Sequence, residues 1–303
     1  MQSFFTKRVV AAIVIIAALG VGLFAYIFLR NNSAPTQPVS AVPPAETKAP
    51  VPERKVIGLS VEGRALEAFT YGNGLPAQAG KTNIAFVGGM HGGYEWNSVV
   101  LAYQFMDYLA ANPEAVPANL TVTVIPSANP DGVYKVIGKE GRFTAEDVPK
   151  DISTVPGRLN AHAVDLNRNF DCKWKPDAVW RGTPVSAGTA PFSEPESAAI
   201  RNFVLENKPS AVIFWHSQSN AVYASECKTG ILPATLDIMN AYSRASGYPA
   251  VKSFDAYEVT GDSEGWLASI GIPAITVELQ THETIEWERN LAGIKALLKY
   301  YGR

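Results

Sequence analysis

Two side chains with metal-binding chemistry stand close together in the stretch GGMHGGYEWNS, residues 88–98. His91 and Glu95 are four positions apart, and a second histidine, His216, lies far along the chain in FWHSQ. A catalytic zinc usually has three protein ligands drawn from His, Glu, Asp and Cys, with one position left open. His91, Glu95 and His216 therefore form a candidate ligand set. The alternative for each histidine is a hydrogen-bonded core residue near the end of a strand.

Further polar side chains stand between these ligands and after them. The stretch AVDLNRNFD, residues 163–171, contains Asp165, Asn167 and Arg168, and Glu278 follows in TVELQ. A carboxylate beside a metal can act as a general base, and an arginine can bind a carboxylate through two parallel N–H bonds. The alternative for Arg168 is a surface ion pair.

These side chains need a scaffold that brings them together. Strand patterns alternate with helical patterns along the chain. The strands are expected at 82–90, 118–132, 210–217 and 272–280, and the helices at 98–113, 193–208, 234–247, 263–271 and 284–302. Such alternation favours an α/β domain with a largely parallel sheet covered by helices, where ligands bind beyond the carboxyl ends of the strands. Because His91, His216 and Glu278 lie at those ends, we expect them on one rim.

From about residue 56 the chain resembles the zinc carboxypeptidases of the M14, carboxypeptidase A-like family, in its compact bacterial form. The DLNRNF stretch is the most specific feature, and the His/Glu pair, the distant His and the late Glu follow the family's order. The resemblance implies a mixed, largely parallel sheet with helices on both faces. It also implies one Zn2+ per chain and a metallocarboxypeptidase that hydrolyses the C-terminal residue of peptides through a zinc-activated water.

The resemblance also assigns roles to individual residues. His91, Glu95 and His216 match the zinc ligands, and Asp165 matches the carboxylate that orients a ligand histidine. The remaining matches are catalytic or substrate-binding: Glu278 as general base, Arg158 polarising the scissile carbonyl, Asn167 and Arg168 holding the terminal carboxylate, and Tyr257 closing over the substrate.

Two positions depart from the family pattern. The family pair is HxxE, whereas this chain has HxxxE, which leaves the zinc geometry open unless the adjacent glycines absorb the extra residue. Tyr94 stands where many members carry an arginine, so the substrate contact made there is also open.

The residue seven places after Tyr257 is Glu264, which the resemblance puts at the bottom of the pocket for the departing side chain. An acid there would favour an amine-bearing side chain such as lysine, arginine or the diaminopimelate of bacterial wall peptides, because a buried unpaired charge is costly. Asp262 would face the same pocket. The alternative is that Glu264 is a solvated residue on a short helix.

The N-terminus has a different composition. Residues 9–29 carry no charge and would span roughly 31 Å as a helix, the thickness of a bilayer core. We predict a cytoplasmic N-terminus at 1–8, a transmembrane anchor at 9–29, a Pro-rich linker at 30–54 and a zinc carboxypeptidase domain at 55–303. Lys7 and Arg8 favour a single-pass protein of the inner, cytoplasmic membrane with a periplasmic catalytic domain. A cleaved signal peptide is the alternative.

Composition excludes one class of partner and constrains the compartment. The net charge of −2 supplies no basic field for nucleic acid, so nucleic acid is not expected as a partner. The resemblance implies a peptide with a free C-terminal carboxylate as the partner. Cys172 and Cys227 are the two cysteines, and in an oxidising compartment they could form one disulfide. Two separate buried thiols are the alternative.

Two other functions compete with the carboxypeptidase. One is a zinc amidohydrolase on the same fold that cuts γ-linked amides or small acyl-amino-acid amides. The other is an inactive binding module, against which the intact set of His91, Glu95, His216 and Glu278 argues.

Overall fold

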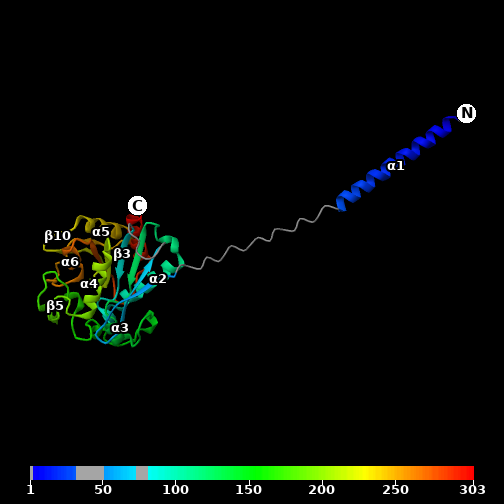
Figure 1. Cartoon of the computed structure of the whole chain (residues 1–303). Coiled ribbons are helices and arrows are strands. Elements are labelled where there is room, and N and C mark those ends of the chain that lie inside the picture. Colours follow the sequence, from blue (N-terminus) through cyan, green and yellow to red (C-terminus); the bar gives the residue numbers. More distant parts are fainter. Residues whose placement is uncertain (1–2, 32–50, 73–80) are drawn as a thin grey trace. The chain divides into compact units, whose positions relative to one another are not determined.

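The computed structural model describes residues 3–31, 51–72 and 81–303, with side chains from residue 17 onward. It divides the chain into two units, Met1–Lys48 and Ala49–Arg303. The described part of the first unit is helix α1 (Ser3–Asn31), which includes the predicted anchor (Figure 1). Among the residues whose side chains are described, from residue 17 onward, no helix is long and apolar enough to cross a membrane. Most of the predicted linker, residues 32–50, lies outside the described residues.

An eight-stranded sheet forms the centre of the second unit, in the order β1-β2-β4-β3-β7-β12-β8-β11. The middle strands β4, β3, β7 and β12 are parallel, whereas β1, β2 and β8 pair antiparallel with their neighbours towards the middle. The sheet is therefore mixed with a parallel centre, as predicted. Its strands are β1 (Glu53–Leu59), β2 (Ala65–Tyr71), β3 (Thr82–Val87), β4 (Leu120–Ile125), β7 (Ala211–Ser217), β8 (Ala221–Ala224), β11 (Ala250–Val251) and β12 (Ala274–Leu279). β1 begins two residues inside the segment assigned to the linker.

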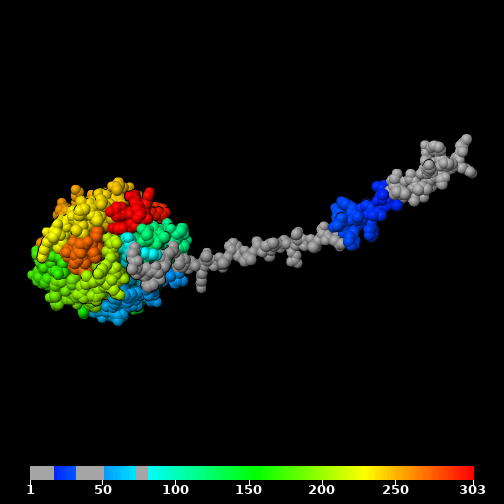
Figure 2. All heavy atoms as spheres, turned by 45° about the horizontal axis from the view of Figure 1, so that its top comes forward, coloured from blue at the N-terminus to red at the C-terminus, as the bar shows by residue number. Residues whose placement is uncertain are grey.

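Helices cover both faces of this sheet and bury two apolar clusters. One cluster contains side chains of α2 (Trp96–Ala111), α3 (Pro130–Ile137), α5 (Pro233–Ser246) and α7 (Trp287–Tyr301). The other contains side chains of α4 (Pro195–Asn207) and α6 (Ser263–Ser269). α7, red in Figure 2, lies beside α5 at the surface of this unit. Both faces of the parallel strands are thus buried, which explains their nearly continuous apolar sequences.

The alternation of side chains along β7 and β12 positions two site residues. Ile213 and Trp215 of β7 point into the α2 side, whereas Val212 and Phe214 point into the α4 side. Because side chains alternate with period two, His216 follows Phe214 to the α4 side. In β12 the register pairs Glu278 with His216. The two residues therefore sit next to each other at the carboxyl ends of adjacent parallel strands.

Smaller elements complete the second unit. Two hairpins, β5 (Asp177–Trp180) with β6 (Thr183–Ser186) and β9 (Glu226–Cys227) with β10 (Gly230–Ile231), were not predicted from the sequence. Cys172 and Cys227 form a disulfide that joins the segment after DLNRNF to the β9 hairpin. The 3-10 turns are η1 (Gly92–Glu95), η2 (Pro113–Ala115), η3 (Ala145–Asp147), η4 (Val155–Gly157) and η5 (Leu166–Arg168).

Candidate metal centre and substrate pocket

The turn between His91 and Glu95 accommodates the extra residue of the HxxxE pair. It forms η1, and Gly92 has a φ of +48°. A Cβ at Gly92 would lie 2.5 Å from the carbonyl oxygen of Gly157 and 2.8 Å from the Cα of Gly132. Only glycine permits both this φ and this approach, so the turn packs directly against two distant segments.

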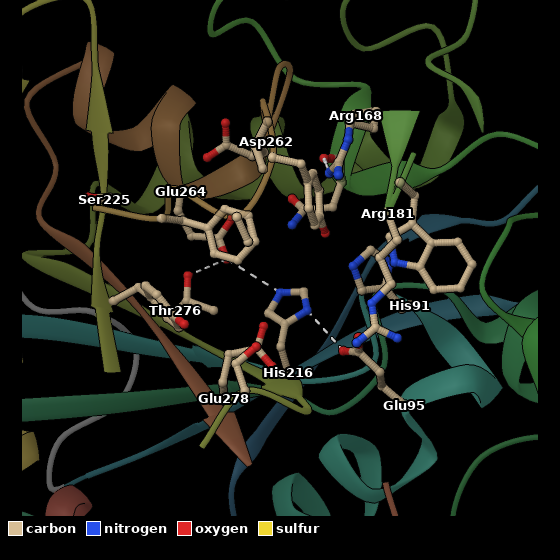
Figure 3. A pocket seen from close by; sticks show the side chains of 18 of the residues that line it. His91, Glu95, Arg168, Arg181, His216, Ser225, Asp262, Glu264, Thr276 and Glu278 are labelled. Atoms are coloured by element: carbon tan, nitrogen blue, oxygen red, sulfur yellow. Dashed lines mark hydrogen bonds and ion pairs between the residues drawn. The ribbon is translucent and has the colours of Figure 1, made fainter. Parts of the chain in front are cut away.

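The three candidate ligands come together in the structure. His91, Glu95 and His216 are buried, and one potential ligand atom from each lies within 4.8 Å of the others. Glu95 Oε2 is 2.9 Å from His216 Nδ1, and the two imidazole rings have centroids 4.9 Å apart. Figure 3 shows His216 between Glu95 and Glu264. Two imidazoles and one carboxylate are a donor set that suits zinc.

Two ring nitrogens of this set lack hydrogen bonds although they are buried. Within the described residues, neither His91 Nδ1 nor His216 Nε2 has a hydrogen-bond partner. Their nearest carboxylate oxygens, on Asp165 and Glu264, lie at 3.5 and 3.4 Å as ion-pair contacts rather than hydrogen bonds. Burying a ring nitrogen without a hydrogen-bond partner costs free energy, and coordination of a metal by that nitrogen would remove the cost. The residues therefore fit a metal ion.

The charges at the centre also favour a cation. Burial and the nearby Arg158 keep the pKa of His91 well below its usual value, which leaves the neutral imidazole that a metal requires. Burial opposes protonation of His216, but Glu95 and Glu264 outweigh it and raise its pKa well above the usual value. Burial, together with Glu95, raises the pKa of Glu278 to about 8. Glu95 and Glu264 thus place negative charge beside His216, and a cation would neutralise it.

Asp165 and Arg158 support this centre from one side. The Asp165 carboxylate lies 3.5 Å from His91 Nδ1, as an ion-pair contact. Its Oδ2 accepts hydrogen bonds from Arg158 Nε at 3.1 Å and Nη2 at 2.8 Å. Arg158 Nη1 lies 3.9 Å from Glu95 Oε1 and makes no hydrogen bond within the described residues. Asp165 therefore holds Arg158 in place while this nitrogen stays available on the pocket side.

Asn167 and Arg168 line the same pocket, and both are buried. Asn167 Oδ1 accepts hydrogen bonds from the Ser263 backbone N–H and hydroxyl, which ties η5 to α6. Arg168 donates to the carbonyl oxygens of Val179, through Nε and Nη2, and of Asn167, through Nη1. A guanidinium has five N–H bonds, so these three leave two for a substrate.

The remaining predicted residues line a cavity of about 430 Å³ in front of the metal ligands. Tyr257 lies on its wall and packs edge-on against Phe254. Asp262 caps α6 by accepting from the Gly265 N–H, and burial together with Glu264 raises its pKa to about 7.

Glu264 is only 4% exposed, so the alternative of a solvated residue is wrong. Its carboxylate accepts hydrogen bonds from Ser263 at 2.8 Å and Thr276 at 2.9 Å, and it faces His216. Burial works against its charge, but His216 outweighs burial and lowers the pKa of Glu264 to about 2. Glu264 is therefore a buried carboxylate in the pocket wall that also contacts His216, and the sequence did not predict this contact.

The sequence missed another wall of this cavity. Trp180 and Arg181, at the tip of the β5–β6 hairpin, line it together with Tyr94. Trp180 packs edge-on against Tyr94 and lies under the Arg158 guanidinium. The Arg-Gly pair at the turn was the only local signal, because the flanking strands have four residues each.

The chain was compared with known proteins. The model of the zinc carboxypeptidase family, peptidase M14, matches residues 45–290. Gamma-D-glutamyl-L-diamino acid endopeptidase 1 of Lysinibacillus sphaericus is 25% identical over 257 residues, which cover 77% of this chain and 62% of that protein. This chain therefore spans less than two thirds of the length of that relative.

Solved structures share the fold. Bovine thrombin-activatable fibrinolysis inhibitor, in complex with tick carboxypeptidase inhibitor, aligns with a TM-score of 0.61 at 20% identity, covering 83% of this chain and 88% of that one. Murein-tripeptide amidase MpaA from Escherichia coli O157 aligns with a TM-score of 0.57 at 22% identity, covering 86% and 96%. With the family model spanning most of the second unit and the ligand set of His91, Glu95 and His216 assembled, this chain belongs to the zinc carboxypeptidase (M14) family of hydrolases, and zinc is its cofactor.

Proposed function

We propose that this protein is a metallocarboxypeptidase that removes the C-terminal residue of peptides. The observation that carries this proposal is the buried Arg168 guanidinium, which lines the cavity in front of the metal ligands and keeps two N–H bonds uncommitted. A guanidinium of this kind binds a carboxylate bidentately. Only the last residue of a peptide carries an α-carboxylate next to the scissile bond. An enzyme that requires this contact is therefore an exopeptidase.

Glu278 is the general base of the proposed reaction. Bound zinc supplies Lewis-acid chemistry, lowering the pKa of a water and polarising a carbonyl. Glu278 Oε2 has no hydrogen-bond partner within the described part of the chain, and its carboxylate borders the cavity beside His216. It takes a proton from the attacking water and delivers it to the nitrogen of the leaving amine.

Arg158 stabilises the negative charge that develops on the carbonyl oxygen. Two of its nitrogens are held by Asp165, and Nη1 faces the cavity side near Glu95. A donor fixed in advance costs no reorganisation when the charge appears, which is why such groups contribute strongly to catalysis. Asn167 positions α6 and the neighbouring Arg168 for the terminal carboxylate.

Glu264 selects an amine-bearing side chain on the departing residue. Replacing Glu264 by alanine is expected to lower kcat/KM for Lys-ended peptides by roughly 2–5 kcal/mol, about thirtyfold or more, because a buried cation then loses its partner. Glu264 also contacts His216, so its replacement changes the surroundings of a metal ligand and affects every substrate. The decisive measurement is therefore the ratio of kcat/KM for Lys-ended and Leu-ended peptides, which reports specificity alone.

The matched control is Glu258→Gln, which removes one negative charge from an exposed position on the same cavity. It should leave the Lys/Leu ratio unchanged. A wild-type enzyme that prefers Leu-ended or Phe-ended peptides would contradict the assigned role of Glu264.

A zinc amidohydrolase acting on γ-linked amides is the second candidate. One relative is named for a γ-D-glutamyl-L-diamino acid bond, and one structural neighbour is a murein-tripeptide amidase. The acidic wall formed by Asp262 and Glu264 suits the free amine of a diamino acid equally well in either bond type. Mass spectrometry of digests of ordinary C-terminal peptides and γ-linked wall peptides distinguishes the two functions.

We further propose that the catalytic domain is exported and held at the inner membrane by residues 9–29. The uncharged length of this segment and the preceding Lys7 and Arg8 support the anchor. The Cys172–Cys227 disulfide supports an oxidising compartment, since such bonds are rare in the cytosol.

Deletion of residues 9–29 is expected to move the protein from the membrane pellet to the soluble fraction, because the apolar segment is the only proposed attachment. Immunoblots of fractionated cells measure the shift, and protease treatment of spheroplasts reports whether the domain faces outwards. A full-length chain that is already soluble and shortened at its N-terminus would instead support a cleaved signal peptide.

A further inference from the structure

Arg181 is a cation on the cavity that the mechanism above does not use. It is exposed, borders the cavity with Tyr94 and Trp180, and makes no hydrogen bond or ion pair with any described residue. Two other arginines of this cavity are committed, because Arg158 is held by Asp165 and Arg168 by backbone carbonyls. Arg181 therefore keeps its whole guanidinium for a ligand.

The backbone that carries Arg181 is held firmly against the catalytic residues. Val179 accepts two hydrogen bonds from Arg168, and the Trp180 ring lies 4.3 Å from the guanidinium carbon of Arg158. At the other end of the hairpin, Ser186 accepts a hydrogen bond from the backbone N–H of Asp165. Arg181 thus projects from a short turn whose base is part of the catalytic framework.

The turn itself places an unusual residue at its tip. Arg181 and Gly182 both have positive φ, +50° and +80°, between the paired residues Trp180 and Thr183. Two-residue hairpin turns of this kind favour Asn, Asp or Gly at the first position. A long cationic side chain in this left-handed conformation costs free energy, so its presence calls for a functional explanation.

The position of Arg181 relative to Glu264 indicates which part of a substrate it meets. Figure 3 shows the two residues on opposite sides of His216. If the wall of Glu264 and Asp262 receives the departing residue, the scissile carbonyl lies at the metal ligands. The residue on the acyl side of the bond then extends towards Arg181, Trp180 and Tyr94.

The charges near Arg181 leave it attractive to an anion. The ionisable groups that its charge reaches are Tyr94 and His282. Neither is a carboxylate. Glu95, the acid next to Tyr94, is already engaged by His216 at 2.9 Å. A carboxylate brought by the substrate would therefore meet an unneutralised guanidinium.

We infer that Arg181 binds a carboxylate on the residue at the acyl side of the scissile bond, a specificity that rests on the proposed peptidase function. Two sources of this carboxylate exist: the side chain of Asp or Glu in an ordinary peptide, or the free α-carboxylate of a glutamate linked through its γ-carboxyl. Arg181 then selects a negative charge on the residue before the scissile bond, and Glu264 selects a positive charge on the residue after it.

Matched peptide pairs test this inference and separate the two sources. One pair is Ala-Glu-Lys and Ala-Gln-Lys, and the other is γ-glutamyl-lysine with a free α-carboxylate or with an α-carboxamide. In the zinc-loaded enzyme, we expect kcat/KM to favour the carboxylate member of at least one pair about tenfold, the effect of about 1.4 kcal/mol from a charge-assisted hydrogen bond. The pair that shows the preference identifies the source.

Variants assign that preference to Arg181. Arg181→Gln should reduce the preference to within about twofold, while Arg181→Lys should keep part of it because the charge remains. Arg244→Gln is the matched control, since Arg244 is also exposed, has no hydrogen bond or ion pair within the described residues and lies on α5 outside the cavity. It should leave the preference unchanged.

Binding measurements keep this test independent of turnover. In a Glu278→Gln background, calorimetry with the same peptide pairs should show the same carboxylate preference and its loss with Arg181→Gln. Equal affinities and equal kcat/KM within both pairs would overturn the inference while leaving the proposed peptidase function intact. Carboxylate-selective binding without any cleavage by the wild type would overturn the proposed function instead and support the role of Arg181.

Discussion

Replacing Glu278 by glutamine is expected to preserve zinc binding and to lower kcat by about 10²- to 10⁴-fold. The substitution keeps the shape of the side chain but removes its capacity to accept a proton, and general acid–base catalysis contributes an effect of this size. The metal ligands His91, Glu95 and His216 remain unchanged, so elemental analysis should find one zinc per chain in the wild type and in the variant. Chelation should abolish wild-type activity, and added zinc should restore it.

The control for this experiment is Glu288→Gln, a substitution of the same type on the exposed face of α7, away from the cavity. It should retain both zinc and turnover. A Glu278→Gln enzyme with wild-type turnover would refute the proton-transfer role. An active wild-type protein without stoichiometric transition metal would refute the metal centre itself.

Replacing Arg168 by alanine is expected to lower kcat/KM for free-acid peptides by roughly 2–5 kcal/mol, about thirty- to five-thousand-fold. The terminal carboxylate of the substrate would lose its bidentate partner in a buried wall. For the same reason, the wild type should cleave C-terminally amidated peptides poorly. The variant should no longer distinguish the acid from the amide, and this loss of discrimination is the quantity to measure.

Arg168 also donates to Val179 and Asn167, so its removal could disturb the hairpin as well as the substrate contact. Arg168→Lys serves as the second variant, because lysine keeps the charge but offers no planar fork. We expect it to bind free-acid peptides better than the alanine variant and still worse than the wild type. Equal cleavage of amidated and free-acid peptides by the wild type would show that the enzyme is not an exopeptidase.

Local patterns in the sequence were sufficient to predict how the principal site residues converge. The strand alternation of β7 and β12 determines which face His216 and Glu278 occupy, since successive side chains point to opposite sides. Parallel strands then bring both residues to the same edge of the sheet. His91 was predicted on the same rim because it also follows a predicted strand. The roles of Glu95 and of the DLNRNF residues came from the resemblance to the zinc carboxypeptidases.

Contacts between segments far apart in the chain decided the remaining features. The HxxxE turn closes because Gly92 packs against Gly132 and Gly157, and no local pattern around residue 92 specifies those neighbours. Glu264 is buried because β12 supplies Thr276 and β7 supplies His216 to its carboxylate, whereas its own short helix would equally suit solvent. Arg181 enters the cavity because its hairpin is anchored to Arg158 and Arg168. The spacing of apolar residues in a segment predicts which of its faces is buried. The residues that contact this face depend on how the whole domain packs.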